Sequence, residues 1–371
     1  MFFELASWHR ILLSLAMAFA VSFAMVPPVR RFAVSVGAID QPSARRINAY
    51  PVPRMGGIAI FCGYVLAVLL FAELTDQVKG ILIGAMIIAV MGALDDVFNL
   101  SPWIKLLAQF AAAAVCISCG VMVDAVSTFV GETGYFQIGH ISSFVLTALW
   151  IVGCTNAINL IDGLDGLAVG MATISAATLF VISLEVADVN VSVLLACLIG
   201  ACLGFWPYNR NPAKIFMGDV GSQMLGFVLS SVSVVGLFKM HALVTMLIPV
   251  LAMAVPLADT AFAFIRRILR GQSPFHADKG HFHHRLLALG LTQHQAVIVL
   301  YSISLVLGIF AYLMVGETRS VKIVCLVAAF CIVLGIILYV FRIYPHRKDA
   351  AAESGSIVEE DVKIYRKGSK K

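Results

Sequence analysis

Charged residues are scarce in this chain of 371 residues, of which only 13% are Asp, Glu, Lys or Arg and 60% are hydrophobic. Soluble domains carry about 25% charged residues, so the composition excludes an ordinary soluble enzyme, and we expect no nucleic-acid partner. An internal repeat is also missing, and no low-complexity segment precedes the C-terminal tail. These features predict a polytopic membrane protein embedded in the lipid bilayer.

The sequence also lacks a disulfide framework and a cleavable signal peptide. All eight cysteines fall within apolar runs, so we expect them to pack as small hydrophobic residues. The first apolar run, 11–26, is followed by Pro-Pro-Val-Arg-Arg without a small-x-small cleavage site. It is therefore expected to remain as the first membrane span.

Eleven apolar runs are long enough to cross a bilayer, since a helix rises about 1.5 Å per residue and the hydrocarbon core is about 30 Å thick. They are approximately 10–29, 56–74, 79–94, 103–123, 141–161, 166–184, 189–207, 219–238, 243–264, 295–315 and 320–342. The predicted fold is an all-α polytopic membrane protein with 10–11 transmembrane helices. It has a single transmembrane domain over 1–343 and a charged, disordered tail over 344–371. Glycines between β-prone stretches predict a small external β-hairpin near 125–140.

The distribution of Lys and Arg predicts the orientation of the spans. With the 30–55 loop placed in the cytoplasm, 21 of the 26 basic residues fall on the cytoplasmic side and five on the other. Cytoplasmic segments of membrane proteins are enriched in Lys and Arg, so we expect the N-terminus outside and the C-terminus in the cytoplasm. The same alternation brings every unusual polar cluster to the cytoplasmic face.

Carboxylates and amides form three of these clusters. Asp95 and Asp96 end the third run, Asp219 begins the eighth, and Asn156-Ala-Ile-Asn159-Leu-Ile-Asp162-Gly-Leu-Asp165-Gly166 joins the fifth to the sixth. Two glycines in the last stretch predict a helix break that turns its oxygens into a common cavity. Capping and solvated helix ends are the ordinary alternatives. The clusters together favour Mg²⁺, which prefers a few protein oxygens plus substrate phosphates.

Basic side chains accompany the carboxylates. The sequence Gly-His-Phe-His-His-Arg over 280–285 predicts a short helix that stops at Gly290, with His281, His284 and Arg285 on one face and His283 directed elsewhere. Phosphate binding, zinc ligation and solvated histidines all remain open, and the basic surroundings favour phosphate. Lys105 either snorkels to the interface or neutralises a phosphate beside Asp95 and Asp96. Asp259, inside the ninth run, needs a cavity or a polar partner, and the sequence assigns it no role.

Oxygens for a divalent cation and basic groups for phosphates, at a site open to cytoplasm and bilayer, describe phosphoryl transfer from a soluble phosphoanhydride to a lipid phosphate. A transporter is a rival, but carriers place polar residues near the midplane within inverted repeats. An intramembrane aspartyl protease would need Gly-x-Gly-Asp, and Met217-Gly218-Asp219 lacks the first glycine. A UbiA-type prenyltransferase would need Asp-x-x-x-Asp pairs, which differ from the spacings here.

These motifs, in this order and over about residues 30–300, resemble the signatures of the polyprenyl-phosphate N-acetylhexosamine-1-phosphate transferases of glycosyltransferase 4 type. Pro53-Arg54-Met-Gly-Gly57 resembles the early cytoplasmic loop of that family. The His-x-His-His pattern at 281–284 is similar to the WecA/TagO-like branch. The MraY-like muramyl-pentapeptide branch has a run of adjacent histidines instead.

The resemblance implies transfer of N-acetylglucosamine-1-phosphate from UDP-GlcNAc to undecaprenyl phosphate, giving undecaprenyl-diphospho-GlcNAc and UMP, with Mg²⁺ or Mn²⁺ as cofactor. It implies the initiating step of cell-wall or surface polysaccharide synthesis, of teichoic acid or O-antigen type, at the cytoplasmic face of the cell membrane. UDP-MurNAc-pentapeptide or another UDP-HexNAc is the alternative substrate. A homodimer is compatible with the sequence, and the downstream polymer stays open.

The resemblance also implies roles for individual residues. Asp219 and Asn159 would hold the metal, while Asp95 and Asp96 would act as the catalytic pair that orients or deprotonates the lipid phosphate. Lys105 and Arg54 would bind phosphate. The nucleotide and sugar would contact Asn156, Asp162, Asp165, His281, His283, His284 and Arg285. Direct attack by the lipid phosphate and a covalent aspartyl route both stay open.

Overall fold

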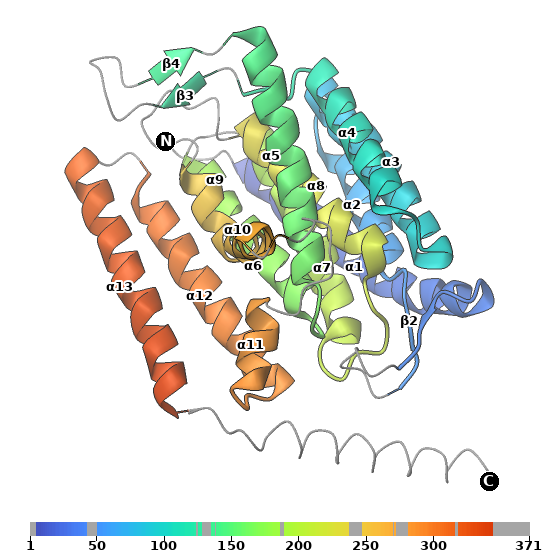
Figure 1. Cartoon of the computed structure of the whole chain (residues 1–371). Helices are drawn as coiled ribbons and strands as arrows, with labels where there is room; N and C mark the ends of the chain where they lie inside the picture. Colours follow the sequence, from blue (N-terminus) through green and yellow to red (C-terminus); the bar gives the residue numbers. More distant parts are fainter. Residues whose placement is uncertain are drawn as a thin grey trace.

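The described residues of the chain form a bundle of α-helices with two short β-ribbons (Figure 1). The computed structural model describes residues 5–42, 50–123, 125–127, 135–137, 139–185, 189–236, 247–269, 271, 281–315 and 318–343. Within these residues the all-α membrane class is confirmed.

Eight helices in the described ranges are long and apolar enough to cross a membrane. They are α1 (Leu5–Ser35), α3 (Asp76–Phe98), α5 (His140–Ile161), α6 (Leu167–Glu185), α7 (Val189–Asn209), α8 (Gly218–Gly236), α12 (Gln293–Leu313) and α13 (Arg319–Ile343). Two shorter apolar helices, α2 (Gly57–Phe71) and α4 (Pro102–Ser118), coincide with the second and fourth predicted runs. The predicted total of 10–11 spans stays a prediction, because two of these helices are short.

The predicted run 243–264 does not form one straight helix. It contains α9 (Leu247–Ala252) and α10 (Ala254–Leu269), and Figure 1 shows α10 nearly end-on while α12 and α13 run lengthwise. Pro256 suits the first turn of α10 because it has no backbone N–H to donate. The carbonyl of Ala252, at the break, accepts a hydrogen bond from the hydroxyl of Ser175 at 2.7 Å. Such a partner is what a helix break within a bilayer requires.

Helix α8 forms the centre of the bundle. All of its residues except Asp219 are buried, and it packs against α3 on one side and α5 on another. Its first turn approaches two neighbouring helices closely: a Cβ on Gly57 of α2 would lie 2.1 Å from the Gly221 nitrogen, and one on Gly92 of α3 would lie 2.5 Å from the Val220 nitrogen. Small residues allow such backbone approach between membrane helices. The ends of α2 and α3 are thereby held beside Asp219.

The two β-ribbons are antiparallel pairs. Strand β3 (Ala125–Ser127) pairs with β4 (Tyr135–Gln137), which confirms the hairpin predicted near 125–140. Strand β1 (Ile39–Asp40) pairs with β2 (Val52–Pro53), a ribbon that the sequence did not predict because strands of two residues carry no periodicity. The Pro53 carbonyl accepts the Phe216 N–H at 2.8 Å, so this ribbon is tied to the segment that leads into α8.

Three other predictions, on the cysteines, the C-terminal tail and the orientation of the chain, have different outcomes. The eight cysteines are free thiols, as expected, but only four of them are buried, three are partly buried, and Cys331 on α13 is exposed. The predicted tail over 344–371 lies outside the described residues. The orientation of the chain, with the N-terminus outside, and the single-domain boundary at 343 stay predictions.

Candidate active site

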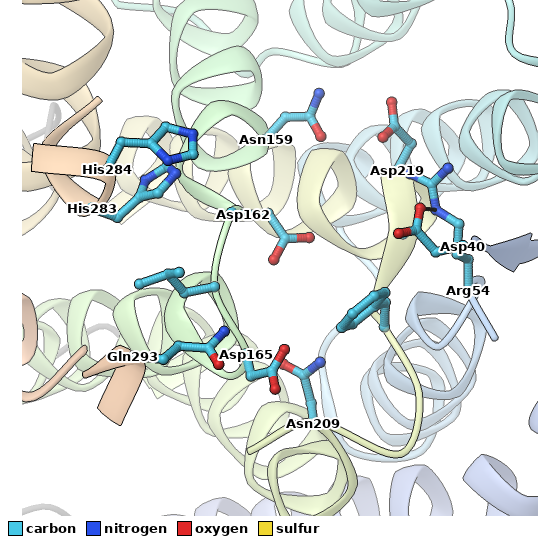
Figure 2. A pocket seen from close by; sticks show the side chains of 14 residues that line it. Asp40, Arg54, Asn159, Asp162, Asp165, Asn209, Asp219, His283, His284 and Gln293 are labelled. Carbon is cyan, nitrogen blue, oxygen red and sulfur yellow. Dashed lines mark ion pairs between the residues drawn. The ribbon is translucent and has the colours of Figure 1, made fainter. Parts of the chain in front are cut away.

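A polar cavity of about 370 Å³ opens at the end of the bundle where α5 ends and α8 begins (Figure 2). Asp40 of the ribbon and Arg54, which follows its second strand, lie on one side, and α11 (Phe282–Ala288) lies on the opposite side. The cavity is lined by Asp40, Arg54, Asn159, Asp162, Gly163, Leu164, Asp165, Asn209, Phe216, Gly218, Asp219, His283, His284 and Gln293. Of the predicted site residues, the structure brings seven together around this cavity: Arg54, Asn159, Asp162, Asp165, Asp219, His283 and His284.

The predicted helix break supplies two of the carboxylates. Helix α5 ends at Ile161 and α6 begins at Leu167, so Asp162 and Asp165 lie in the connection. The pKa of Asp162 is raised to about 7, first by burial and then by nearby Asp219, while Arg54 opposes both effects. Burial also raises the pKa of Asp165. Asp165 Oδ2 accepts hydrogen bonds from the Asn211 amide at 2.9 Å and the Ala213 N–H at 3.0 Å, so Asp165 also anchors the segment between α7 and α8.

Asp219, Asp95 and Lys105 form a compact cluster contributed by three helices. The Lys105 ammonium lies 2.8 Å from Asp95 Oδ2 and 2.9 Å from Asp219 Oδ2. Asp95 Oδ1 accepts the Leu100 N–H at 2.7 Å, which fixes the turn between α3 and α4. An ammonium between two carboxylates compensates their mutual repulsion. Lys105 therefore contacts both acids that the sequence assigned to catalysis and metal binding.

Asp96 caps the start of α8. Its carboxylate accepts the backbone N–H groups of Asp219 at 3.1 Å and Val220 at 3.5 Å. The Arg54 Nε lies 3.6 Å from the same carboxylate. Gly218 has φ +70°, and a Cβ there would lie 2.1 Å from Asp96 Oδ2, so glycine is required for both reasons. The ordinary alternative of Asp219 as its own helix cap is wrong, because the cap comes from α3.

A buried amide network lies beneath Asp219. Gln223 donates to Asp219 Oδ2 at 2.7 Å, Gln109 donates to Gln223 at 2.8 Å, and Asn156 donates to Gln109 at 2.7 Å. Asn156 also donates to the Val152 carbonyl at 2.8 Å, and it does not line the cavity. The sequence assigned Asn156 to nucleotide binding and missed both glutamines. A Gln within an apolar helix was the signal that could have found them, since a buried polar group needs a partner.

Asn159, in contrast, reaches the cavity directly. Its Oδ1 accepts the Ser222 hydroxyl at 2.6 Å, which joins α5 to the first turn of α8. Asn159, Asp162 and Asp219 therefore present amide and carboxylate oxygens to the same space (Figure 2). Among the described residues no cation forms an ion pair with Asp162, and Arg54 acts on its charge only through the longer-range electrostatic interaction. These hard oxygen donors fit a cation such as Mg²⁺. The described residues contain no group of three or more His, Cys, Asp or Glu side chains gathered as a ready metal site.

The histidines are arranged differently from the prediction. His283 and His284 line the polar cavity, whereas His281 is held by Asp259 and Arg285 lines a separate apolar cavity of about 420 Å³. The expected shared face of His281, His284 and Arg285 is therefore wrong. His281 precedes α11 with extended backbone angles, so helical periodicity does not apply to it. The predicted short helix with a glycine stop is confirmed, since Gly290 has φ +94°.

His283 packs tightly against the connection that carries Asp162. A Cβ on Gly163 would lie 2.3 Å from the His283 Nε2, so only glycine leaves room for this ring. The pKa of His283 is lowered to about 4, first by burial and then by neighbouring His284. His283 Nδ1 is buried and has no hydrogen-bond partner among the described residues. His283 is thus a neutral imidazole at pH 7.

Three polar lining residues were missed by sequence reasoning. Asp40 lies 3.9 Å from the Arg54 Nε, Asn209 accepts the Gly166 N–H at 3.2 Å, and Gln293 begins α12. Each lies at an element end without a repeating pattern around it. The sequence therefore carried no periodic signal for them.

Known proteins similar to this chain share one activity in their names. Residues 78–237 match the family described as Glycosyl transferase family 4. The chain is 44% identical over 313 residues to the probable undecaprenyl-phosphate N-acetylglucosaminyl 1-phosphate transferase of Bacillus subtilis (strain 168), covering 83% of this chain and 87% of that protein. It is 36% identical over 313 residues to the decaprenyl-phosphate N-acetylglucosaminephosphotransferase of Mycolicibacterium smegmatis, covering 76% of each chain. It is 29% identical over 287 residues to the undecaprenyl-phosphate alpha-N-acetylglucosaminyl 1-phosphate transferase of Escherichia coli (strain K12), covering 73% and 75%.

Proposed function

Since this chain belongs to the polyprenyl-phosphate HexNAc-1-phosphate transferases of glycosyl transferase family 4, we propose that it transfers N-acetylglucosamine-1-phosphate from UDP-GlcNAc to undecaprenyl phosphate. The products are undecaprenyl-diphospho-GlcNAc and UMP. The observation that supports this reaction best is the cavity in which carboxylates and amides meet Arg54 and, through Asp219, Lys105. The names of the relatives support the sugar and the lipid.

In the proposed reaction an oxygen of the lipid phosphate attacks the phosphorus that carries the sugar. The new oxygen–phosphorus bond forms as the bond to the bridging oxygen breaks, and UMP leaves with that oxygen and the bonding electron pair. The lipid phosphate already carries a nucleophilic oxygen, so direct attack needs no covalent enzyme intermediate. Positioning and charge compensation are then the main contributions of the protein.

The basic residues compensate the phosphates. Lys105 holds a positive charge between Asp95 and Asp219, and Arg54 holds one beside Asp96 and Asp40. An incoming phosphate would compete with these carboxylates for the two cations, which brings its oxygens next to Asp95 and Asp96. These two acids would then orient the phosphate or accept its proton.

Asp219 and Asn159 would hold Mg²⁺ or Mn²⁺, which when bound supplies positive charge to the diphosphate. Asp162 and Asp165 would face the nucleotide from the connection between α5 and α6. His283 stays neutral near pH 7 and would donate or accept a hydrogen bond at the sugar-diphosphate, with His284 beside it. Neutral imidazole suits this position because it does not compete with the cation for negative charge.

We also assign the cavity to the cytoplasmic face of the cell membrane, where UDP-sugars are available, and the product to cell-wall or surface polysaccharide synthesis of teichoic acid or O-antigen type. The excess of Lys and Arg in the segments around the cavity supports this orientation.

The test is UMP release by the purified protein with undecaprenyl phosphate, Mg²⁺ and one UDP-sugar at a time. UDP-GlcNAc is expected to be turned over, and omission of the lipid phosphate is expected to stop the reaction. Turnover of UDP-MurNAc-pentapeptide alone would overturn the choice of sugar. UMP release that does not depend on the lipid phosphate would overturn the transferase reaction itself.

A further inference from the structure

Asp259 is a buried acid outside the polar cavity. It lies on α10, and only 2% of its surface is exposed. Both carboxylate oxygens are engaged: His281 Nδ1 lies 2.8 Å from Oδ2, and the backbone N–H of Phe282 donates to Oδ1 at 2.8 Å. A buried carboxylate is costly unless it is paired or hydrogen-bonded in this way. One side chain of α10 therefore fixes both the His281 ring and the start of α11.

The start of α11 depends on this contact. His281 occupies the position before the helix, with φ −61° and ψ 153°, and its side chain makes no capping hydrogen bond within α11. The helix has only seven residues, so it cannot be stable through its own hydrogen bonds. A carboxylate at the first turn of a helix also interacts favourably with the helix dipole. Asp259, on α10, thus supplies the side-chain acceptor for the first backbone N–H of α11 that α11 does not supply itself.

The contact continues from His281 to the cavity. The rings of His281 and His283 lie parallel, with 4° between their planes and 5.8 Å between their centres. The ring centres of His283 and His284 lie 4.3 Å apart. His283 in turn packs against Gly163 beside Asp162. A change in the His281 ring or in the first turn of α11 therefore moves the two histidines that line the cavity.

We propose that Asp259 is a positioning residue for the transfer reaction: it orients His281 and anchors α11 so that His283 and His284 stay in the cavity wall. The reaction itself rests on the proposed function. With the carboxylate as acceptor, the His281 ring donates from Nδ1, which sets its tautomer and orientation. A purely structural ion pair would stabilise the fold without affecting the histidines of the cavity.

The kinetic test compares Asp259→Asn with wild type, in the native background and in a His281→Ala background. The asparagine keeps the shape and one acceptor oxygen but lacks the charge and the second acceptor.

In the native background we expect kcat to fall about 10- to 100-fold, the range for losing the carboxylate partner of a functional histidine, with the melting temperature and the KM for the lipid phosphate unchanged. In the His281→Ala background the same substitution is expected to cost less than about 2-fold, because residues that act through one another are not additive. Asp76→Asn is the matched control, since Asp76 is an exposed acid with 83% of its side chain accessible, and is expected to behave as wild type.

A second readout does not need turnover. Carbethoxylation by diethyl pyrocarbonate, mapped by mass spectrometry, reports how accessible His281 and His283 are; they are 6% and 2% exposed in the native protein. Asp259→Asn is expected to increase the labelling of both rings, and Asp76→Asn is not. If wild type does not turn over UDP-GlcNAc, the proposed function fails while the labelling still tests Asp259. Equal losses of kcat in the two backgrounds, a loss that merely follows a fall in melting temperature, or labelling identical to wild type would each overturn the positioning role.

Discussion

Two groups in one cavity are expected to give opposite pH dependence of stability. His283 has a pKa lowered from 6.5 to about 4 by burial, and Asp162 has a pKa raised from 3.8 to about 7 by burial. Between about pH 6.5 and 4 the unfolded state takes up a proton at His283 that the folded state does not, so acidification destabilises the fold through this histidine. Between about pH 7 and 3.8 the folded state takes up a proton at Asp162 that the unfolded state does not, so acidification stabilises the fold through this aspartate.

The two contributions nearly cancel in the native protein. Integrating each titration from pH 7 to pH 5 gives a loss of about 2 kcal/mol through His283 and a gain of about 2 kcal/mol through Asp162. Single substitutions separate them. In His283→Gln only the gain remains, so stability should rise by about 2 kcal/mol relative to wild type over this interval. In Asp162→Asn only the loss remains, so stability should fall by about the same amount.

The assay is unfolding of the purified protein in mixed micelles by increasing denaturing detergent, at pH 7 and pH 5 and with EDTA present. EDTA removes divalent cations, which would otherwise lower the pKa of a carboxylate in the cavity. The double substitution His283→Gln with Asp162→Asn is the control, and its change with pH should match that of wild type. Parallel pH curves for wild type and both single variants would refute the assigned pKa directions.

Three further predictions concern the metal, the histidine wall and the topology. Asp219→Ala should lower UMP release by more than about 100-fold while the protein still inserts in the membrane, because it removes a proposed ligand and the partner of Lys105; full activity would contradict the metal assignment. Gly163→Ala should destabilise the protein by about 1–3 kcal/mol and displace His283, since the added Cβ would lie 2.3 Å from the ring. Gly153→Ala is its control in a melting experiment, because nothing lies within 4 Å of a Cβ at that position. A tag at the C-terminus should be protected from protease added outside intact cells, and cleavage would reverse the orientation.

Much of the bundle was predictable because it depends on local composition. Runs of apolar residues predicted the long helices, the glycines near Asp162 predicted the break between α5 and α6, and Gly290 predicted the end of α11. The run 243–264 misled the prediction because composition alone does not report a bend. At its break the Ala252 carbonyl needs a hydrogen-bond donor from outside the helix, and the hydroxyl of Ser175 in α6 provides it.

The candidate site was less predictable because its details depend on contacts between distant segments. Asp96 caps a helix more than a hundred residues later, Asn156 turns toward Gln109 rather than the cavity, and Asp40 reaches the site through a ribbon of four residues. Asp259 had no assigned role in the sequence because its partner, His281, lies 22 residues away and outside the helix that carries Asp259. Motif recognition indicated the residues of the candidate site, whereas the partner of each side chain required the three-dimensional structure.

The burial of α8 has a consequence for the biogenesis of the protein. Its serines and Gln223 face other helices on every side, and α8 would expose them to lipid if it were inserted alone. Its neighbours α2, α3 and α5 all precede it in the chain, so the helices that surround α8 are already synthesised when it leaves the ribosome. Docking of α8 brings Asp219 to Lys105 and fills the centre of the bundle in one step. The nascent chain therefore acquires its tertiary core and the contact between Lys105 and Asp219 in the same event, whereas the histidines of the cavity, on α11, are added later.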